Sequence, residues 1–246
     1  MNYEIAIPSY NRPELIQEKT LALLHRLNIP HEKITVFVAD ENEKRIYQNS
    51  HSKIVVGKLG LCNQRNFIRK YYPEGTKIIW MDDDVQDLKF INADKKILSV
   101  TNLDQVVEIG FKNCIKAGTK LWGIYPLINN MFMSHTITQD LRYIAGPFYG
   151  TINDQRSTLD GTLPVKEDFE RTLEYYSEFG AVVRLNYVGI LTKYYNNTGG
   201  LGHVRTEELV KKCCEELLKR YPMYCSVDTK KKGKYLEIKV RNSAKF

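Results

Sequence analysis

Three consecutive aspartates, Asp82, Asp83 and Asp84, come directly after the apolar run KIIWM. Carboxylates this close together repel one another unless a partner lies among them. Their oxygen atoms suit hard divalent cations such as Mg²⁺ or Mn²⁺, and Mg²⁺ sites commonly add the phosphates of a substrate. Alternation of side chains along the chain predicts that Asp82 and Asp84 point to one side and Asp83 to the other. The pattern indicates either a metal site or a solvated acidic turn.

Two further patterns contain residues that can do chemistry. Glu167 and Asp168 open a predicted helix, where a carboxylate could take a proton from an attacking hydroxyl. Acids are also favoured in a first helical turn by the helix dipole, and that is the simpler explanation of the pair. His203 lies in the glycine-rich stretch TGGLGHVR. Its imidazole could join two carboxylates on a metal, or it could be an ordinary surface residue.

The first two-thirds of the chain alternates short β-rich runs with helical patterns, which is typical of a mainly parallel sheet covered by helices. The carboxyl ends of such strands form the usual ligand-binding edge. Pro8, Tyr10 and Asn11 follow the first predicted strand, Asp40 follows the second, and the three aspartates follow the central one. The predicted strands of this part span 3–7, 33–40, 53–57 and 76–82, with helices over 13–27 and 61–72.

The rest of the sequence alternates less regularly between strand and helix patterns. Gly, Pro and Asn break the stretch 120–153 into short strands, and no linker separates it from residues 154–246. We therefore expect one domain with a C-terminal extension. The elements predicted here are a hairpin over 88–100, a helix over 103–118, strands near 121–126 and 143–150, helices over 164–180 and 207–221, and a hairpin over 224–240.

The composition limits the classes of protein to which this chain can belong. The chain has 246 residues, of which 43% are apolar, enough for a sizeable core. Five cysteines show no metal-ligand spacing, and their odd number favours a reduced, cytoplasmic protein. The N-terminal sequence does not resemble a signal peptide, and no apolar run approaches the ~20 residues of a membrane span.

The positive charge is uneven. The net charge is +7, and residues 206–246 hold eleven Lys or Arg against six Asp or Glu, so they contribute +5. Excess positive charge attracts polyanions, among which nucleic acid is the usual one, although a solubilising surface explains it equally well. Lys230, Lys231, Lys232 and Lys234 could contact phosphates at the tip of the last hairpin, or be a solvated turn.

The motifs IPSYNRPEL, the acid after the second strand, the RN pair on the next helix and WMDDD together resemble the GT-A nucleotide-sugar glycosyltransferases, over roughly residues 5–205. The order WMDDDV, GPFYGTINDQR, PVKEDFERTLEYY and GGLGHVR is similar to the TET-associated glycosyltransferases, found largely in phages. That family is associated with sugar transfer to hydroxymethylated DNA bases. The resemblance implies a GT-A catalytic domain over 1–205, with 206–246 as a basic helix-hairpin extension packed on the same domain.

The resemblance also implies a nucleotide-sugar site, with a UDP-sugar as the donor. The residues that match its nucleotide-binding positions are Pro8, Tyr10 and Arg12 in the first-strand loop, Asp40 after the second strand, and Arg65 and Asn66 on the next helix. Asp40 matches an acid that binds uracil or ribose. It stands in VADENE rather than in the commoner paired-acid pattern, so Glu41 and Glu43 stay open as alternatives.

Metal and catalytic residues are implied by the same resemblance. The three aspartates match the motif that holds a divalent metal, Mn²⁺ or Mg²⁺, and the ribose, with Asp82 and Asp84 as ligands and Asp82 and Asp83 toward the nucleotide. His203 matches a histidine that completes the metal shell, and Arg205 could reach the diphosphate. Asp168 matches the catalytic base, with Glu167 as the reserve.

The predicted function is transfer of a hexose, from UDP-glucose by preference, to a hydroxymethylated pyrimidine such as hydroxymethylcytosine in DNA. The predicted location is the cytoplasm, which is that of the host cell if a bacteriophage encodes the protein. Phe148 and Tyr149 could stack an extruded base, or be ordinary core aromatics. The alternatives are the same chemistry on a saccharide or protein acceptor, and a catalytically inactive nucleic-acid-binding module. A nucleotidyltransferase on a related fold would need a glycine-rich phosphate loop, which IPSYNRPEL does not supply.

Overall fold

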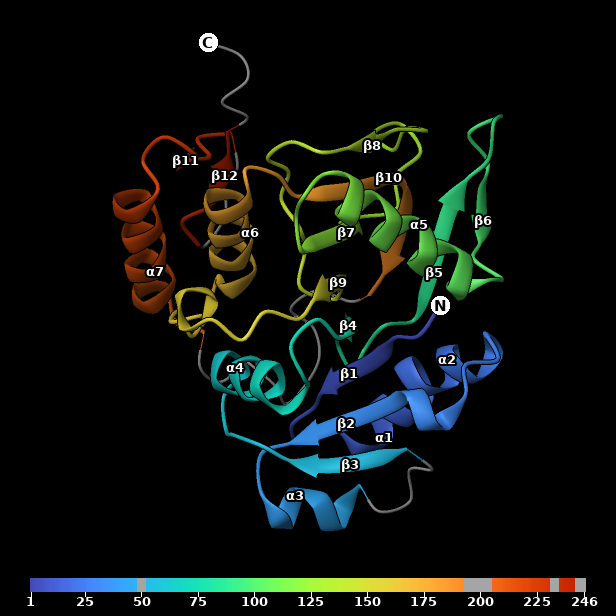
Figure 1. Cartoon of the computed structure of the whole chain (residues 1–246). Helices are drawn as coiled ribbons and strands as arrows, with labels where there is room; N and C mark the ends of the chain where they lie inside the picture. Colours follow the sequence, from blue (N-terminus) through green and yellow to red (C-terminus); the bar gives the residue numbers. More distant parts are fainter. Residues whose placement is uncertain (48–51, 193–204, 231–234, 242–246) are drawn as a thin grey trace.

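A computed structural model of the chain describes residues 1–47, 52–192, 205–230 and 235–241. Most of its strands join one ten-stranded sheet in the order β3-β2-β1-β4-β9-β7-β10-β5-β6, with β8 paired to β10 (Figure 1). The strands are β1 (Glu4–Pro8), β2 (Ile34–Val38), β3 (Lys53–Val56), β4 (Lys77–Met81), β5 (Asp87–Ile91), β6 (Ile97–Ser99), β7 (Leu121–Tyr125), β8 (Ile137–Thr138), β9 (Phe148–Ile152) and β10 (Val183–Leu191).

The sheet has a parallel half and a mixed half. Strands β3, β2, β1 and β4 pair in parallel, as the alternating sequence pattern predicts. Beyond them, β9 lies antiparallel between β4 and β7, and β10 pairs in parallel with β7. The β5–β6 hairpin closes this end, as predicted. Because β1, β2 and β4 run the same way, the residues after them meet at one edge of the sheet.

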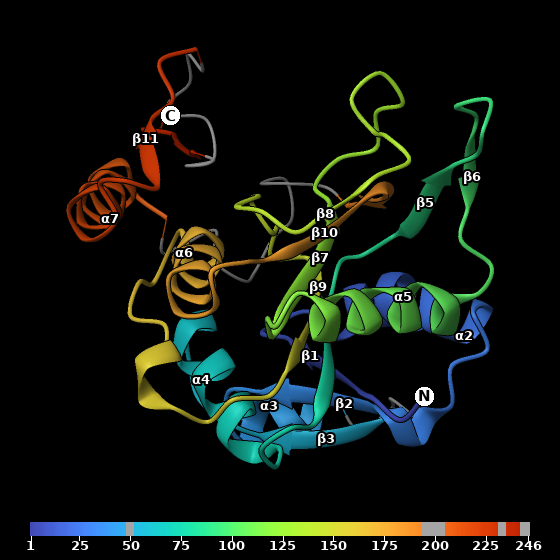
Figure 2. The same ribbon diagram turned by 45° about the horizontal axis from the view of Figure 1, so that its top comes forward.

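Helices cover both faces of the sheet (Figure 2). The helical elements are α1 (Pro13–Ile16), η1 (Gln17–Leu21), α2 (Ala22–Arg26), η2 (His31–Lys33), α3 (Glu41–Ile46), α4 (Leu61–Tyr71), α5 (Leu103–Lys116), η3 (Ser157–Leu159), α6 (Glu167–Phe179) and α7 (Glu207–Arg220). The single helix predicted over 13–27 begins at Pro13 as expected, but a π-helical turn, η1, interrupts it. The helix after Asp40, α3, is not among the predicted elements.

Three hydrophobic clusters hold these layers together. The first packs α2 and α5 on one face of the sheet, through residues such as Leu24 and Phe111. The second packs α4 and α6 on the other face, around Trp80. The third joins α6 to α7 and to a separate antiparallel hairpin of β11 (Cys225–Val227) and β12 (Ile238–Val240). The helix-hairpin extension thus packs on α6, while the boundary at residue 205 stays a prediction.

One core contact depends on two glycines. The Trp122 ring is fully buried between α5 and the sheet. A Cβ atom at Gly110 would lie 2.4 Å from this ring, and one at Gly150 only 2.1 Å from its Nε1 atom. Both positions therefore require the absence of a side chain. Among the described helices, none has both the length and the apolar character needed to cross a membrane.

Candidate active site

Asp83, the middle residue of the acidic run, is held by the loop that follows β1. Its carboxylate accepts a 2.6 Å hydrogen bond from the Ser9 hydroxyl and a 2.8 Å bond from the Arg12 guanidinium. Tyr47 supports this loop, because its phenol oxygen accepts from the Arg12 amide and bonds Ser9. Burial raises the pKa of Asp83, while Arg12 and Ser9 oppose that rise. Asp83 therefore ties the first-strand loop to the end of β4.

Asp82 and Asp84 contact other partners. The Asp82 carboxylate accepts a 3.0 Å bond from Arg65 of α4, and Asp84 accepts a 2.9 Å bond from the Thr192 hydroxyl just beyond β10. Asp84 also lies 3.9 Å from Arg12, the cation that binds Asp83. Each aspartate thus has a partner from a different element, which explains how three carboxylates can be adjacent. The expected arrangement, with Asp82 and Asp84 together opposite Asp83, is only partly seen, since Asp83 and Asp84 both approach Arg12.

The backbone of this acidic loop is fixed by Thr20 of the π-helical turn. The buried Thr20 hydroxyl donates to the Asp82 carbonyl at 2.7 Å and accepts from the Val85 amide at 3.0 Å. π-helical turns are frequent at functional sites. Here the turn places the Thr20 hydroxyl between the Asp82 carbonyl and the Val85 amide, so it bonds the backbone at both ends of the acidic run.

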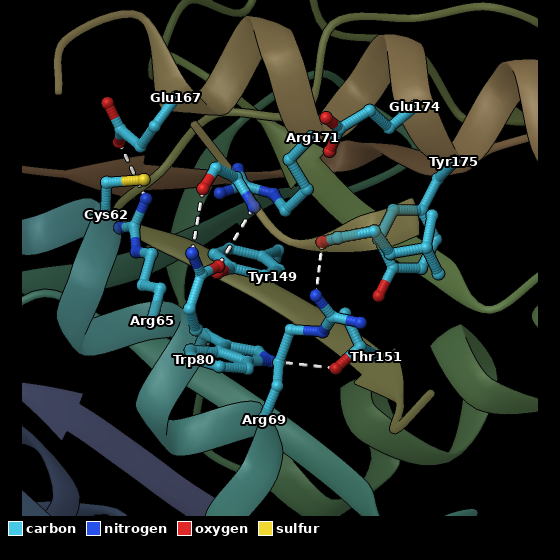
Figure 3. A pocket seen from close by; sticks show the side chains of 13 residues that line it. Cys62, Arg65, Arg69, Trp80, Tyr149, Thr151, Glu167, Arg171, Glu174 and Tyr175 are labelled. Carbon is cyan, nitrogen blue, oxygen red and sulfur yellow. Dashed lines mark hydrogen bonds and ion pairs between the residues drawn. The ribbon is translucent and has the colours of Figure 1, made fainter. Parts of the chain in front are cut away.

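Arg65 connects the acidic loop to the start of α6. Its guanidinium donates to Glu167 at 2.7 Å and to Asp82 at 3.0 Å, and the Glu167 contact is drawn in Figure 3. Burial alone would lower the pKa of Arg65, yet Tyr149, Glu167 and Asp82 raise it on balance. Burial raises the pKa of Asp82 to about 7 against the Arg65 charge, and the neighbouring Asp84 adds to the rise. Arg65 is therefore a buried cation shared by Asp82 and Glu167.

Asp168 lies in the first turn of α6, next to Glu167. Its carboxylate accepts hydrogen bonds from the Tyr143 hydroxyl and, at 2.9 Å, from the Phe169 amide. The preceding residue, Lys166, has a left-handed backbone with φ of 64°, uncommon for a residue with a side chain. Its ammonium group pairs with Glu237 of the extension at 2.8 Å. This pair anchors the turn that presents Glu167 and Asp168.

The predicted nucleotide-binding residues lie at the edge formed by β1 and β2. Pro8 ends β1, and the side chain of Tyr10 is 43% exposed beyond it. Asp40 caps α3 by accepting from the Asn42 and Glu43 amides. Among the alternatives to Asp40, Glu41 is exposed and Glu43 is buried. Glu43 accepts from the Asn11 amide at 2.8 Å, so among these three acids it is the one that contacts the first-strand loop.

Two other predicted nucleotide-binding residues contact parts of the chain that the sequence did not suggest. The Asn66 amide makes two hydrogen bonds to the backbone of Gly161, so it fixes the loop before α6. Arg205 lies beside the extension, where its carbonyl accepts from Tyr235 at 3.5 Å. His203 lies outside the described residues, as do Lys231, Lys232 and Lys234.

Phe148 and Tyr149 point to opposite faces of the sheet, as neighbours on a strand do. Phe148 is buried against Trp122, so it is a core residue rather than a face for an extruded base. Tyr149 is also buried, stacked on Trp80 with ring centroids 5.5 Å apart, and the Arg171 guanidinium lies 3.7 Å from its ring. The competing interpretation, ordinary core aromatics, therefore describes both Phe148 and Tyr149.

The chemistry of the acidic loop fits a divalent cation. Within the described residues, no group of three or more His, Cys, Asp or Glu side chains is arranged to hold a metal ion by itself. Asp82 and Asp84 offer carboxylate oxygens, the ligands Mg²⁺ prefers, and Mg²⁺ usually takes few protein ligands and completes its shell with water and phosphates. That Asp82 and Asp84 hold such a cation together with a substrate diphosphate stays a prediction.

Solved structures share this architecture. Glucosyl-3-phosphoglycerate synthase from Mycobacterium tuberculosis, solved with Mn²⁺, UDP-glucose and phosphoglyceric acid, matches with a TM-score of 0.56 and 9% identity, over 93% of this chain and 84% of that one. The same enzyme with Mg²⁺ and UDP matches with a TM-score of 0.55 and 9% identity, over 98% and 87%. The fold is GT-A-like. This confirms the fold class predicted from the sequence.

A nucleotidyltransferase shares the fold as well. CMP:2-keto-3-deoxy-manno-octonic acid synthetase with CTP matches with a TM-score of 0.50 and 11% identity, over 89% of this chain and 100% of that one. The sequence matches no protein-family description, and no curated protein matches it. The fold is thus common to glycosyltransferases and nucleotidyltransferases, and the similarity to the TET-associated family stays a prediction.

Several residues of the site are absent from the sequence-based candidates, among them Ser9, Thr20, Tyr47, Tyr143 and Thr192. Ser9 stands inside IPSYNRPEL, between two residues that were predicted, so its position was a usable signal. Thr20, Tyr143 and Thr192 lie in stretches with no motif. Their roles come from contacts with residues 25 to 108 positions away, which no local pattern records.

Proposed function

We propose that this protein is a metal-dependent glycosyltransferase that moves a hexose from a UDP-sugar, UDP-glucose by preference, to a hydroxymethylated pyrimidine in DNA. The observation that carries the enzymatic part is the bridge from Asp82 through Arg65 to Glu167. It brings the candidate metal ligands next to the helix that starts with the candidate base. The DNA acceptor rests on the sequence resemblance and on the basic extension.

In the proposed reaction, the acceptor hydroxyl oxygen attacks the anomeric carbon of the donor sugar. The bond from that carbon to the diphosphate oxygen breaks, and its electron pair leaves with the diphosphate. Asp168 takes the hydroxyl proton as the new bond forms. Tyr143 orients the Asp168 carboxylate through its hydroxyl, and Lys166 fixes the turn before it.

The donor would lie along the carboxyl edge of the parallel strands. The first-strand loop, held by Asp83 and Glu43, would contact the nucleotide. Arg65 offers a buried positive charge beside the position of the diphosphate. A divalent cation on Asp82 and Asp84 would neutralise the charge that develops on the leaving diphosphate.

A transfer assay tests this proposal. The protein is incubated with Mn²⁺ or Mg²⁺, a panel of UDP-sugars, and DNA that contains hydroxymethylcytosine, hydroxymethyluracil or neither. Released UDP and the masses of digested nucleosides are measured together. We expect a hexose gain only on hydroxymethylated DNA, lost in Asp84→Asn and in Asp168→Asn. Asp94→Asn, an exposed aspartate at the β5–β6 turn, is the matched control and should keep full activity.

Each other outcome discards a defined part of the proposal. UDP release without any change in the DNA would discard the acceptor and favour a saccharide or protein acceptor. Transfer that survives Asp168→Asn would discard the assigned base. If no donor is consumed, the inactive nucleic-acid-binding module becomes the better description.

A further inference from the structure

A cavity lies between α4, β9 and α6, on the face of the sheet that carries Trp80 and Tyr149 (Figure 3). It offers about 40 Å³ to the centres of water-sized molecules. Arg65 and Arg69 of α4 and Arg171 of α6 all line it, so three guanidinium groups meet around one small space. Arg65, Asn66 and Glu167 belong both to the candidate active site and to the lining of this cavity, whereas none of the three aspartates lines it.

The three arginines bring hydrogen-bond donors that no described residue accepts. Nε of Arg65, Nε of Arg69, and both Nε and Nη1 of Arg171 are buried without a partner in the described part of the chain. The side chains of Arg65 and Arg69 are only 9% and 8% exposed. Buried donors without acceptors cost free energy, so each calls for an explanation such as a water or an ion. An oxyanion beside these three guanidinium groups would supply such acceptors.

The same arginines are already fixed in position by other contacts. Arg65 is held by Asp82 and Glu167, and Arg69 by Asp160 and by backbone carbonyls. Arg171 lies on the Tyr149 ring at 3.7 Å. These contacts fix the three guanidinium groups beside the cavity, so their charges are already in place for a ligand.

The cavity wall also carries two acidic side chains, Glu167 and Glu174. Glu167 is paired with Arg65, whereas Glu174 forms no ion pair within the described part of the chain and is only 8% exposed. Burial, helped by the Glu170 charge, raises the pKa of Glu174 to about 8, against the charges of Arg220, Arg69 and Arg171. At pH 7 this carboxyl is therefore mainly protonated. It adds a donor to the cavity instead of a competing negative charge.

We propose that this cavity binds one oxyanion group, a phosphate or a carboxylate, through Arg65, Arg69 and Arg171. A volume of about 40 Å³ has room for about three waters, or for the few oxygen atoms of one such group, but not for a nucleotide or a sugar. Guanidinium groups match the oxygen atoms of phosphate and carboxylate in geometry as well as in charge. The group is either a free ion or the terminal group of a small molecule. The inference does not depend on the proposed transferase activity.

The test measures binding of inorganic phosphate, acetate and glycerol phosphate by calorimetry at pH 7, with chloride at equal ionic strength as the reference. We expect saturable binding of at least one oxyanion, together with a rise in Tm that chloride does not give. Arg171→Gln should weaken this binding about tenfold or more, since it removes charged donors. Arg142→Gln, whose guanidinium pairs with Asp140 on the surface, is the matched control and should bind as the wild type does. If Arg171→Gln does not fold, Arg171→Lys replaces it: it keeps the charge but loses the planar guanidinium, so weaker oxyanion binding is again expected, and unchanged binding would overturn the inference.

The same measurement separates this cavity from the diphosphate position. Binding should persist in Asp84→Asn and at saturating UDP. If phosphate binding disappears in Asp84→Asn or at saturating UDP but survives in Arg171→Gln, the anion occupies the acidic edge of the sheet and the inference is wrong. If no oxyanion differs from chloride, the cavity holds only water and the inference is likewise overturned. Whichever probe binds with the expected dependence on Arg171 identifies the source: the free ion, a carboxylate or a phosphate ester.

Discussion

Glu174 gives the sharpest prediction about stability. This glutamate on α6 interacts with Glu170 on its own helix, and with the Arg69, Arg171 and Arg220 charges around it. Burial, together with Glu170, raises its pKa from 4.5 to about 8. Glu174→Gln replaces the carboxyl with a neutral group of similar shape, so it removes the titration while leaving the same neighbours in place.

The sign of the effect depends on which state binds the proton. Between pH 4.5 and about 8 the folded protein keeps the Glu174 proton, whereas the unfolded chain loses it. The stability that this residue contributes is therefore complete below pH 4.5 and falls as the pH rises toward 8. Each pH unit is worth about 1.4 kcal/mol, so a rise from pH 5 to pH 8 costs about 4 kcal/mol at most. For a chain of this size that is a difference in Tm on the order of 10 °C.

Thermal unfolding from pH 5 to pH 8.5, in buffers without phosphate, measures this effect. We expect equal Tm values for the wild type and Glu174→Gln near pH 5, and a growing advantage of the variant above pH 6. Groups that titrate in both proteins, such as Asp82, cancel in the difference. Glu108→Gln, at an exposed position on α5, should follow the wild type at every pH. A constant difference between wild type and Glu174→Gln across the range would refute the raised pKa.

Two further predictions concern packing and catalysis. Gly150→Ala places a Cβ atom 2.1 Å from Trp122 Nε1, so we expect a loss of about 1–3 kcal/mol or more in urea unfolding; unchanged stability would show that Trp122 can move aside. Tyr143→Phe removes the hydroxyl that orients Asp168, so we expect kcat of sugar transfer to fall about tenfold or more while calorimetry gives the same Kd for UDP. A parallel loss of UDP affinity would indicate that Tyr143 acts on the donor instead.

Local patterns in the sequence predicted the parts of the fold that depend on neighbouring residues. The apolar run before Asp82 is strand β4, and Pro13 begins the first helix. Gly180 ends α6 with a left-handed backbone, at the last residue of the helix predicted over 164–180. These features arise from side-chain periodicity and from the conformations that Pro and Gly allow, so a few residues are enough to specify them.

Apart from the β5–β6 hairpin, the strand pairing in the mixed half of the sheet was beyond such reasoning. Strand β9 lies between β4 and β7. Its partners in β4 are 67 to 75 residues earlier in the chain, and its partners in β7 are 26 to 30 residues earlier. β10, which pairs with β5, β7 and β8, had no predicted element at all. Pairing at such separations depends on which faces are buried together, and the sequence of one strand does not record that.

The same limit applies to the charges of the site. Repulsion among three adjacent aspartates indicates that cations must lie nearby, but it does not say which ones. Arg65 is 17 residues from Asp82, and Arg12 is 71 residues from Asp83. Asn66 matched a nucleotide-binding position, yet it bonds the backbone of Gly161, 95 residues away. Residue type thus predicted the chemistry of the edge better than it predicted individual partners.

Arg65 belongs to both proposed sites, and this decides which variants can separate them. One guanidinium contacts Asp82 and Glu167 at the candidate active site and presents its buried Nε among the residues that line the cavity. A substitution of Arg65 would remove a partner from each site, so its effect could not be assigned to either. Asp84 does not line the cavity, and Arg171 donates to the Ile144 carbonyl on the cavity side of the sheet. Loss of donor binding in Asp84→Asn with oxyanion binding intact, and the reverse in Arg171→Gln, would establish two sites that share one arginine.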